Sequence, residues 1–262
     1  MKTALRYLFV LLLTIAMAGT SYAQRWKLLR YELVGGIGST NIFGDIGGAA
    51  TRANLLGIKD LRFGATRPNL TLGARYRWKE NQSFRLNLIY GMASENDKNA
   101  VNEKRGFISN SQLFEQSLQY EYYFIPEDKK LHSGAIFSRR GMMNNYAKFA
   151  FYGFGGLGGL LYMPKVTYSL LPPPAQNVRG TGYTGVMMLG IGLKYIYSNK
   201  LVFGAELGGR YALSDGVDGY TSPFSKSNDI YYFATLSIGF RLKTDRFGYP
   251  VFLSNMFPSL RR

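Results

Sequence analysis

Hydrophobic and polar residues alternate in short runs along the chain, and the clearest two runs form a predicted hairpin over 69–92. Apolar residues occupy every second position from Leu70 to Trp78 and again from Phe84 to Met92. A period of two places them on one face of a sheet, since successive side chains of a strand point to opposite sides. The other face carries arginines, which need facing carboxylates. An apolar exterior around a charged interior is typical of a membrane β-barrel.

Six further segments bring the number of predicted strands to eight, and five of them show the same alternation. The cleanest is 114–124, which Pro126 ends because a proline removes a hydrogen-bond donor from the ladder. In 148–162 aromatic residues and glycines occur at both sets of alternating positions. The sequence therefore predicts a strand here but not which of its faces points outward. The other segments are 30–39, 187–197, 201–211 and 231–241. Short turns alternating with long loops then predict an all-β fold, an eight-stranded antiparallel up-and-down transmembrane β-barrel.

The N-terminal segment has the features of a secretory signal peptide. Lys2 and Arg6 precede an apolar run over 7–18, and Ser21-Tyr22-Ala23 has the small-x-small form that signal peptidase cuts. An uncleaved helical anchor is the alternative, but the run is shorter than the roughly 20 residues that a spanning helix needs. The expected domains are a signal peptide over 1–23, the barrel over 24–242 and a periplasmic tail over 243–262.

An exported barrel of this kind is expected in the bacterial outer membrane. The short turns after Trp78 and Tyr197 are expected on the periplasmic side, because such barrels have short periplasmic turns and longer exterior loops. Both termini then lie in the periplasm. The aromatic residues near these turns would form a belt at the membrane interface.

Composition narrows the classes of site and partner. The chain has no cysteine, which rules out thiolate metal sites and leaves sheet closure to stabilise the fold without disulfides. No cofactor is expected, since the glycines of 153–159 are not followed by the Lys-Ser/Thr of a phosphate-binding loop. The formal charge of +16 favours, for an exported protein, outer-membrane lipids, lipopolysaccharide or an acidic protein as partners and no nucleic acid.

The inward-facing charged residues predict a network of ion pairs that fills the barrel lumen. An eight-stranded barrel is just wide enough inside to hold side chains, so a plugged lumen is expected, and a selective channel is the alternative. The predicted network comprises Glu32, Arg75, Arg77, Arg85, Glu115, Glu121, Lys194, Glu206, Arg210 and Arg241.

An enzymatic role is not expected. Barrels that modify lipids need a nucleophile beside a base, usually serine beside histidine. The only histidine, His132, lies in a long connection outside every predicted strand, where a surface role is the simpler interpretation.

Several segments, in their order and spacing, resemble one known family. They are the glycine-rich run from Gly35 to Asp45, Arg75-Tyr76-Arg77, Ser138-Arg139-Arg140-Gly141 ahead of a strand ending Tyr162-Met163-Pro164-Lys165, and Asp215-Gly216-Val217. Together they resemble the PorG-like outer-membrane barrels, over most of the chain after the signal peptide. The resemblance implies a structural, non-enzymatic role in the type IX secretion system, where such barrels associate with the periplasmic ring of the PorK lipoprotein and PorN. A stand-alone structural or adhesive barrel is the alternative.

Two segments on the expected periplasmic rim, 126–146 and 243–262, are long where membrane-filling barrels keep their turns short. Basic and aromatic residues are interleaved in them, a mixture that anchors protein interfaces. The alternative is that the basic residues contact anionic lipid head groups. The predicted partner-binding residues are Lys129, Lys130, Phe137, Arg139, Arg140, Arg246, Phe247, Tyr249, Phe252 and Phe257.

Overall fold

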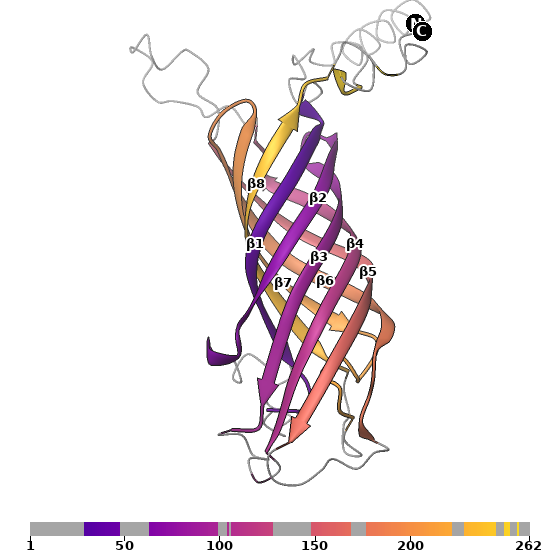
Figure 1. Cartoon of the computed structure of the whole chain (residues 1–262). Helices are drawn as coiled ribbons and strands as arrows, with labels where there is room; N and C mark the ends of the chain where they lie inside the picture. Colours follow the sequence, from indigo (N-terminus) through magenta and orange to yellow (C-terminus); the bar gives the residue numbers. More distant parts are fainter. Residues whose placement is uncertain are drawn as a thin grey trace, which may run out of the picture.

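The alternating segments pair in chain order and close into a barrel, because β1 pairs with both β2 and β8 (Figure 1). The computed structural model describes residues 29–47, 63–98, 104, 106–127, 148–168, 177–221, 228–244, 249–251 and 256. The strands are β1 (Tyr31–Phe43), β2 (Arg67–Lys79), β3 (Gln82–Asn96), β4 (Phe107–Ile125), β5 (Phe149–Tyr168), β6 (Gly182–Ile196), β7 (Leu201–Ala212) and β8 (Ile230–Leu242). A short 3-10 helix, η3 (Phe63–Ala65), precedes β2. The predicted eight-stranded antiparallel barrel is confirmed.

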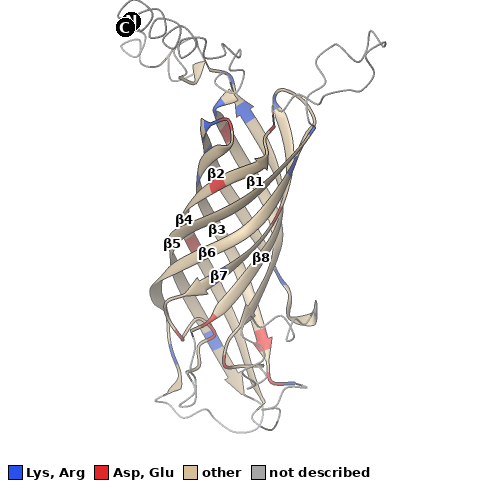
Figure 2. Cartoon of the chain, turned by 180° about the vertical axis from the view of Figure 1, so that it is seen from behind, with Lys and Arg blue, Asp and Glu red and all other residues tan. Residues whose placement is uncertain are grey.

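The two ends of the barrel differ. One end, called the turn end below, carries the short β2–β3 and β6–β7 turns, the start of β1 and the end of β8. The opposite end, called the loop end, carries the connections that follow β1, β3, β5 and β7. Basic and acidic residues lie toward both ends of the barrel (Figure 2).

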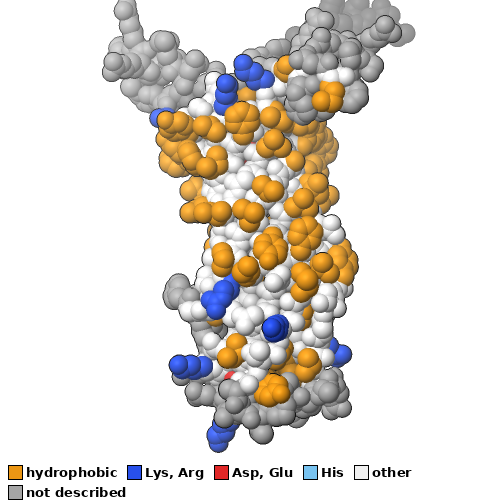
Figure 3. Space-filling model, in the orientation of Figure 1, with side chains coloured by type: hydrophobic (Ala, Val, Ile, Leu, Met, Phe, Trp, Pro, Cys, Tyr) orange, Lys and Arg blue, Asp and Glu red, His pale blue; other side chains and the backbone are white. Residues whose placement is uncertain are grey.

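The outer wall is an apolar belt (Figure 3). Leu72 on β2 and Leu88 on β3 are cross-strand partners and are 57% and 45% exposed, so the facing predicted for the hairpin is correct. Exposed apolar side chains on a closed sheet fit the hydrocarbon of a bilayer, in which every backbone hydrogen bond must be made internally. No helix among the described residues is long and apolar enough to cross a membrane.

Aromatic rings line the outer wall near the turn end. Trp78 contacts Phe84 and Phe84 contacts Tyr120, with ring centroids 5.9 and 5.4 Å apart. The row continues around the barrel through Tyr122–Phe124, Phe124–Phe151, Phe149–Tyr195 and Tyr197–Phe203. Aromatic side chains prefer the interface between head groups and hydrocarbon, so this belt marks one edge of the membrane.

The structure fixes the facing of β5, which the sequence left open. Tyr152 and Phe154 point inward and are buried, whereas Phe151 and Leu157 are exposed on the outer wall. The rings of Tyr152 and Phe154 lie over inward-facing glycines of β6. A Cβ on Gly192 would collide with Tyr152, and one on Gly190 with Phe154. The large rings of β5 are therefore accommodated because β6 has no side chains at these positions.

Several predicted features lie outside the described residues. These are the signal peptide over 1–23 and His132. The tail is described only at 243, 244, 249–251 and 256, where Thr244 pairs with Pro250 and the Val251 N–H donates to the Lys243 carbonyl at 2.9 Å. This part of the tail turns back on itself just beyond β8.

Candidate functional site

The lumen near the turn end is filled by a network of ion pairs. Arg75 pairs with Glu32, and its Nε lies 2.8 Å from Oε2 of Glu121. Arg85 donates from Nη1 to Oε1 of Glu206 at 2.6 Å. Because these charges are buried, each is stabilised only as long as its partner remains.

Cross-strand register explains why the acids are needed. Arg241, Glu32, Arg75 and Arg85 are successive partners across β8, β1, β2 and β3. Glu32 therefore separates Arg241 from Arg75, but nothing in that row separates Arg75 from Arg85. The acids that separate them are Glu121 on β4, the strand next to β3, and Glu206 on β7, on the far side of the lumen.

Glu127 is a member of the network that the sequence analysis missed. It lies just after β4 and accepts hydrogen bonds from Lys194 Nζ at 2.9 Å, Arg241 Nη2 at 2.6 Å and Arg77 Nη1 at 3.3 Å. Burial by itself would raise the pKa of Glu127, but Lys194, Arg241 and Arg77 hold that pKa well below its usual range. One carboxylate thus joins β6, β8 and β2 to the start of the long β4–β5 connection.

A separate pair lies closer to the loop end. Glu115 accepts a hydrogen bond from the Tyr231 hydroxyl at 2.8 Å, and Arg210 Nε lies 3.6 Å from the same carboxylate. The Arg210 guanidinium also stacks 4.5 Å from the centroid of the Phe233 ring. The structure thus brings all ten residues of the predicted network into the lumen; nine are buried and Glu206 is nearly so.

An apolar barrier also crosses the lumen, on the loop-end side of the charged network. It is a buried apolar cluster contributed by β1 and by β3 to β8, which includes Ile42, Ile89, Leu113, Leu160, Tyr231 and Phe233. The charged network thus fills the lumen toward the turn end, and the apolar cluster fills it toward the loop end. Both therefore fill the lumen, an arrangement that fits a plug.

At the loop end, four consecutive backbone N–H groups are bound by carboxylates. Gly44 donates to Glu95 at 3.3 Å, Asp45 and Ile46 donate to Oδ2 of Asp218 at 2.8 and 3.1 Å, and Gly47 donates to Asp97 at 3.0 Å. Gly47 has a φ of +78°, a left-handed conformation that favours glycine. The turn thus directs successive N–H groups at three carboxylates, which is how backbone turns bind anionic groups.

Two buried carboxyl groups meet beside this turn. Burial raises the pKa of Asp218 to about 7, and burial together with Asp218 raises the pKa of Asp229 well above its usual value. Asp229 accepts a hydrogen bond from the Val217 N–H at 2.7 Å. A Cβ at position 44 would lie 2.5 Å from an oxygen of Asp218 and 2.7 Å from one of Asp229, so only glycine fits there. The sequence analysis had assigned these aspartates no role.

Basic residues surround the turn end on the outside. They stand at the ends of the strands or in the turns, and four of the five are exposed: Lys79, Lys148, Lys200 and Lys243, with Arg30 half-buried. Lys79 stacks on the Trp78 ring at 4.7 Å. We call these five residues the basic rim. Of the ten predicted partner-binding residues, only Tyr249 lies in the described part of the chain, where it is 39% exposed.

A metal site would need several His, Cys, Asp or Glu side chains close together. Among the described residues, no three His, Cys, Asp or Glu side chains are placed to hold a metal ion.

Comparison with known proteins gives one family match. The family described as a domain of unknown function (DUF6089) matches residues 6–239. No curated protein matches the chain.

Among solved structures, the chain is similar to small outer-membrane barrels. The N-terminal β-barrel domain of Pseudomonas aeruginosa OprF is 15% identical over 82% of this chain and 98% of that chain, with a TM-score of 0.38. Yersinia pestis Ail, the attachment invasion locus protein, is 10% identical over 82% and 99%, with a TM-score of 0.40. The outer membrane enzyme PagL is 11% identical over 79% and 97%, with a TM-score of 0.33.

Proposed function

We propose that this chain, which belongs to the DUF6089 family, is a non-enzymatic outer-membrane barrel that anchors a periplasmic protein assembly. The assembly is of the type IX secretion kind, a ring like that of PorK and PorN, as the resemblance to PorG-like barrels implies. The turn end faces the periplasm in this proposal, so both termini lie there.

The observation that carries the proposal is the attachment of Glu127. The β4–β5 connection begins with a carboxylate that is held by cations of β2, β6 and β8. Barrels that only fill a membrane keep their periplasmic turns short. Here the start of the long connection is bound to three strands outside its own hairpin, so a load on it would be shared by several strands.

Charge on the turn end supports an acidic partner. The basic rim surrounds the mouth of the barrel, and among the described residues outside the lumen at this end the only acid is Glu80. An acidic protein surface would approach such a rim favourably and orient on it. The plugged lumen makes the barrel an attachment point in this proposal and not the conduit for secreted protein.

Removing the tail tests the proposal. A variant that lacks residues 243–262 should still insert, because β8 ends at Leu242. We expect it to lose the periplasmic ring proteins that co-purify with the full chain and to lose secretion. If the truncated barrel inserts, keeps these partners and secretes normally, the turn end is not the anchoring surface.

A stand-alone adhesive barrel is the second candidate, and the loop end favours it. The carboxylate-bound turn at 44–47 gives this end a defined surface, as an exterior binding site would need. Loss of surface adhesion in an Asp218→Asn variant that secretes normally would support this candidate over the first.

A further inference from the structure

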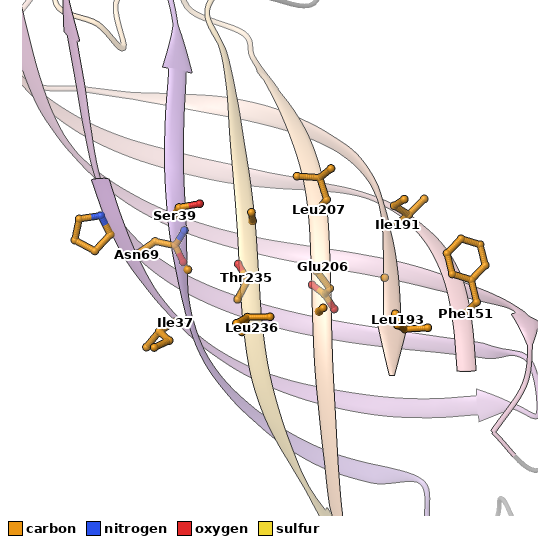
Figure 4. A pocket seen from close by; sticks show the side chains of 15 residues that line it. Ile37, Ser39, Asn69, Phe151, Ile191, Leu193, Glu206, Leu207, Thr235 and Leu236 are labelled. Atoms are coloured by element: carbon orange, nitrogen blue, oxygen red, sulfur yellow. The ribbon is translucent and has the colours of Figure 1, made fainter. Parts of the chain in front are cut away.

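A groove of about 790 Å³ crosses the outer wall of the barrel (Figure 4). Two rows of outward-facing residues form its walls, two positions apart along the strands. One row joins Ile37, Leu236, Ala205, Leu193 and Phe151 as successive cross-strand partners. The other joins Ser39, Ala234, Leu207 and Ile191.

Small residues make the hollow. Ala205 stands between Leu236 and Leu193 in the first row, and Ala234 stands between Ser39 and Leu207 in the second. The large neighbours remain prominent: Leu236 is 66% exposed and Leu207 is 54% exposed. The groove is therefore a narrow depression between aliphatic side chains on the outer surface, within the area of the apolar belt.

The dimensions of the groove favour a single hydrocarbon chain. Residues two positions apart on a strand are separated by roughly 7 Å, which is narrower than the roughly 10 Å of an α-helix with its side chains. The rows cross five strands, or about 19 Å at roughly 4.8 Å per strand. One lipid tail spans about 15 Å, half of the hydrocarbon core.

The groove begins close to the turn end. Phe151 lies near the start of β5 and belongs to the aromatic belt, whereas Ile37 is near the middle of β1. Lys148 directly precedes β5, and its carbonyl accepts a hydrogen bond from the Ile196 N–H at 2.7 Å, which places it beside the end of β6. Lys200 stands in the following β6–β7 turn. Two exposed cations thus lie on the turn-end side of the groove.

We propose that this groove holds one acyl chain of a phospholipid of the periplasmic leaflet, with the lipid phosphate near Lys148 and Lys200. The inference rests on the placement of the turn end in the periplasm. The apolar walls hold the tail by van der Waals packing, and the two lysines select an anionic head group. The bound lipid would occupy a fixed place on the barrel.

Filling the groove tests the proposal. The Ala205→Leu and Ala234→Leu variants should lose most of the retained phospholipid, because a leucine fills the space in which the tail would pack. The matched control is Ala74→Leu, since Ala74 also faces outward but pairs with Leu33 and Leu86, away from the groove. The measurement is the phospholipid retained per barrel after purification in mild detergent, by mass spectrometry. Should a leucine variant fail to fold, Ala205→Val fills the groove more gently.

The lysines provide a second readout. Changing Lys148 and Lys200 to alanine should lower the ratio of anionic to zwitterionic phospholipid that is retained, without changing folding. Equal retention by wild type, groove variants and control would overturn the proposal, and so would retained lipopolysaccharide in place of phospholipid. The heat-dependent gel shift of a folded barrel is measured in parallel, so that a variant that fails to fold is not counted as one that has lost its lipid. Protease accessibility of the tail from the periplasmic side tests the placement of the turn end separately.

Discussion

Arg75 on β2 and Arg85 on β3 are direct cross-strand partners, and both side chains are buried in the lumen. Like charges placed opposite each other destabilise a sheet. Glu121 lies within 2.8 Å of Arg75 and 3.6 Å of Arg85, and Glu206 contacts the same two arginines. The pairing of β2 with β3 therefore depends on acids from β4 and β7.

Replacing Glu121 by alanine should lower the free energy of unfolding by about 3–5 kcal/mol, because one partner of a buried ion pair is removed and the arginines repel. The measurement is urea unfolding followed by gel shift or fluorescence. Glu80→Ala, on the exposed turn, is the control and should have little effect. A Glu121 variant as stable as wild type would contradict the role given to this carboxylate.

A charge on the lipid-facing wall should be costly near the middle of the membrane. Leu72→Arg or Leu88→Arg is expected to destabilise the inserted barrel by about 2–4 kcal/mol. Thr71→Arg, on the inner face, should act through packing in the lumen instead. Negligible effects at both leucines would contradict the assigned facing.

The plugged lumen should not conduct. In planar bilayers the purified barrel is expected to show no stable open-channel current, since the charged network and the apolar cluster lie in series. A steady, ion-selective conductance would favour the alternative of a selective channel.

The loop end should be more stable in acid. Because the pKa of Asp218 is raised to about 7 in the folded state, the folded barrel binds a proton that the unfolded chain releases. Its contribution to stability is full at low pH and is lost as pH rises toward 7. The difference in unfolding free energy between wild type and Asp218→Asn should therefore shift against wild type between about pH 4 and 7. A pH-independent difference would refute this. The difference cancels the titrating groups that do not interact with Asp218, whereas the pKa of Asp229 changes with the substitution.

The strands were predictable because their periodicity is local. The burial of β4 alternates without interruption from Phe107 to Phe124, and its sequence shows the same alternation over 114–124, so the facing of that part follows from the sequence itself. β5 does not, because Phe151 and Tyr152 are both aromatic and adjacent. Its facing depends on Gly190 and Gly192 of β6, which are too far along the chain for a periodic pattern to connect.

The inward set of charges was predictable, but their partners were not. Period two places Arg75 and Glu206 inside the barrel, whereas their 3.5 Å contact depends on closure of the sheet. Glu127 was assigned to the rim because Pro126 ends the strand pattern, although it continues the odd-numbered inward phase of β4. Asp218 and Asp229 lie outside the strands, where no period indicates their burial.

The central claim, that the turn end binds an acidic periplasmic assembly, is tested most directly by reversing charges on the basic rim. Lys79→Glu combined with Lys243→Glu leaves the lumen and the lipid groove intact, and Lys165→Glu on the loop-end part of β5 is the matched exposed control. The measurement is the amount of periplasmic ring protein captured with the inserted barrel. The account predicts loss of capture in the rim variant and normal capture in the control. Normal capture by an inserted rim variant would contradict it.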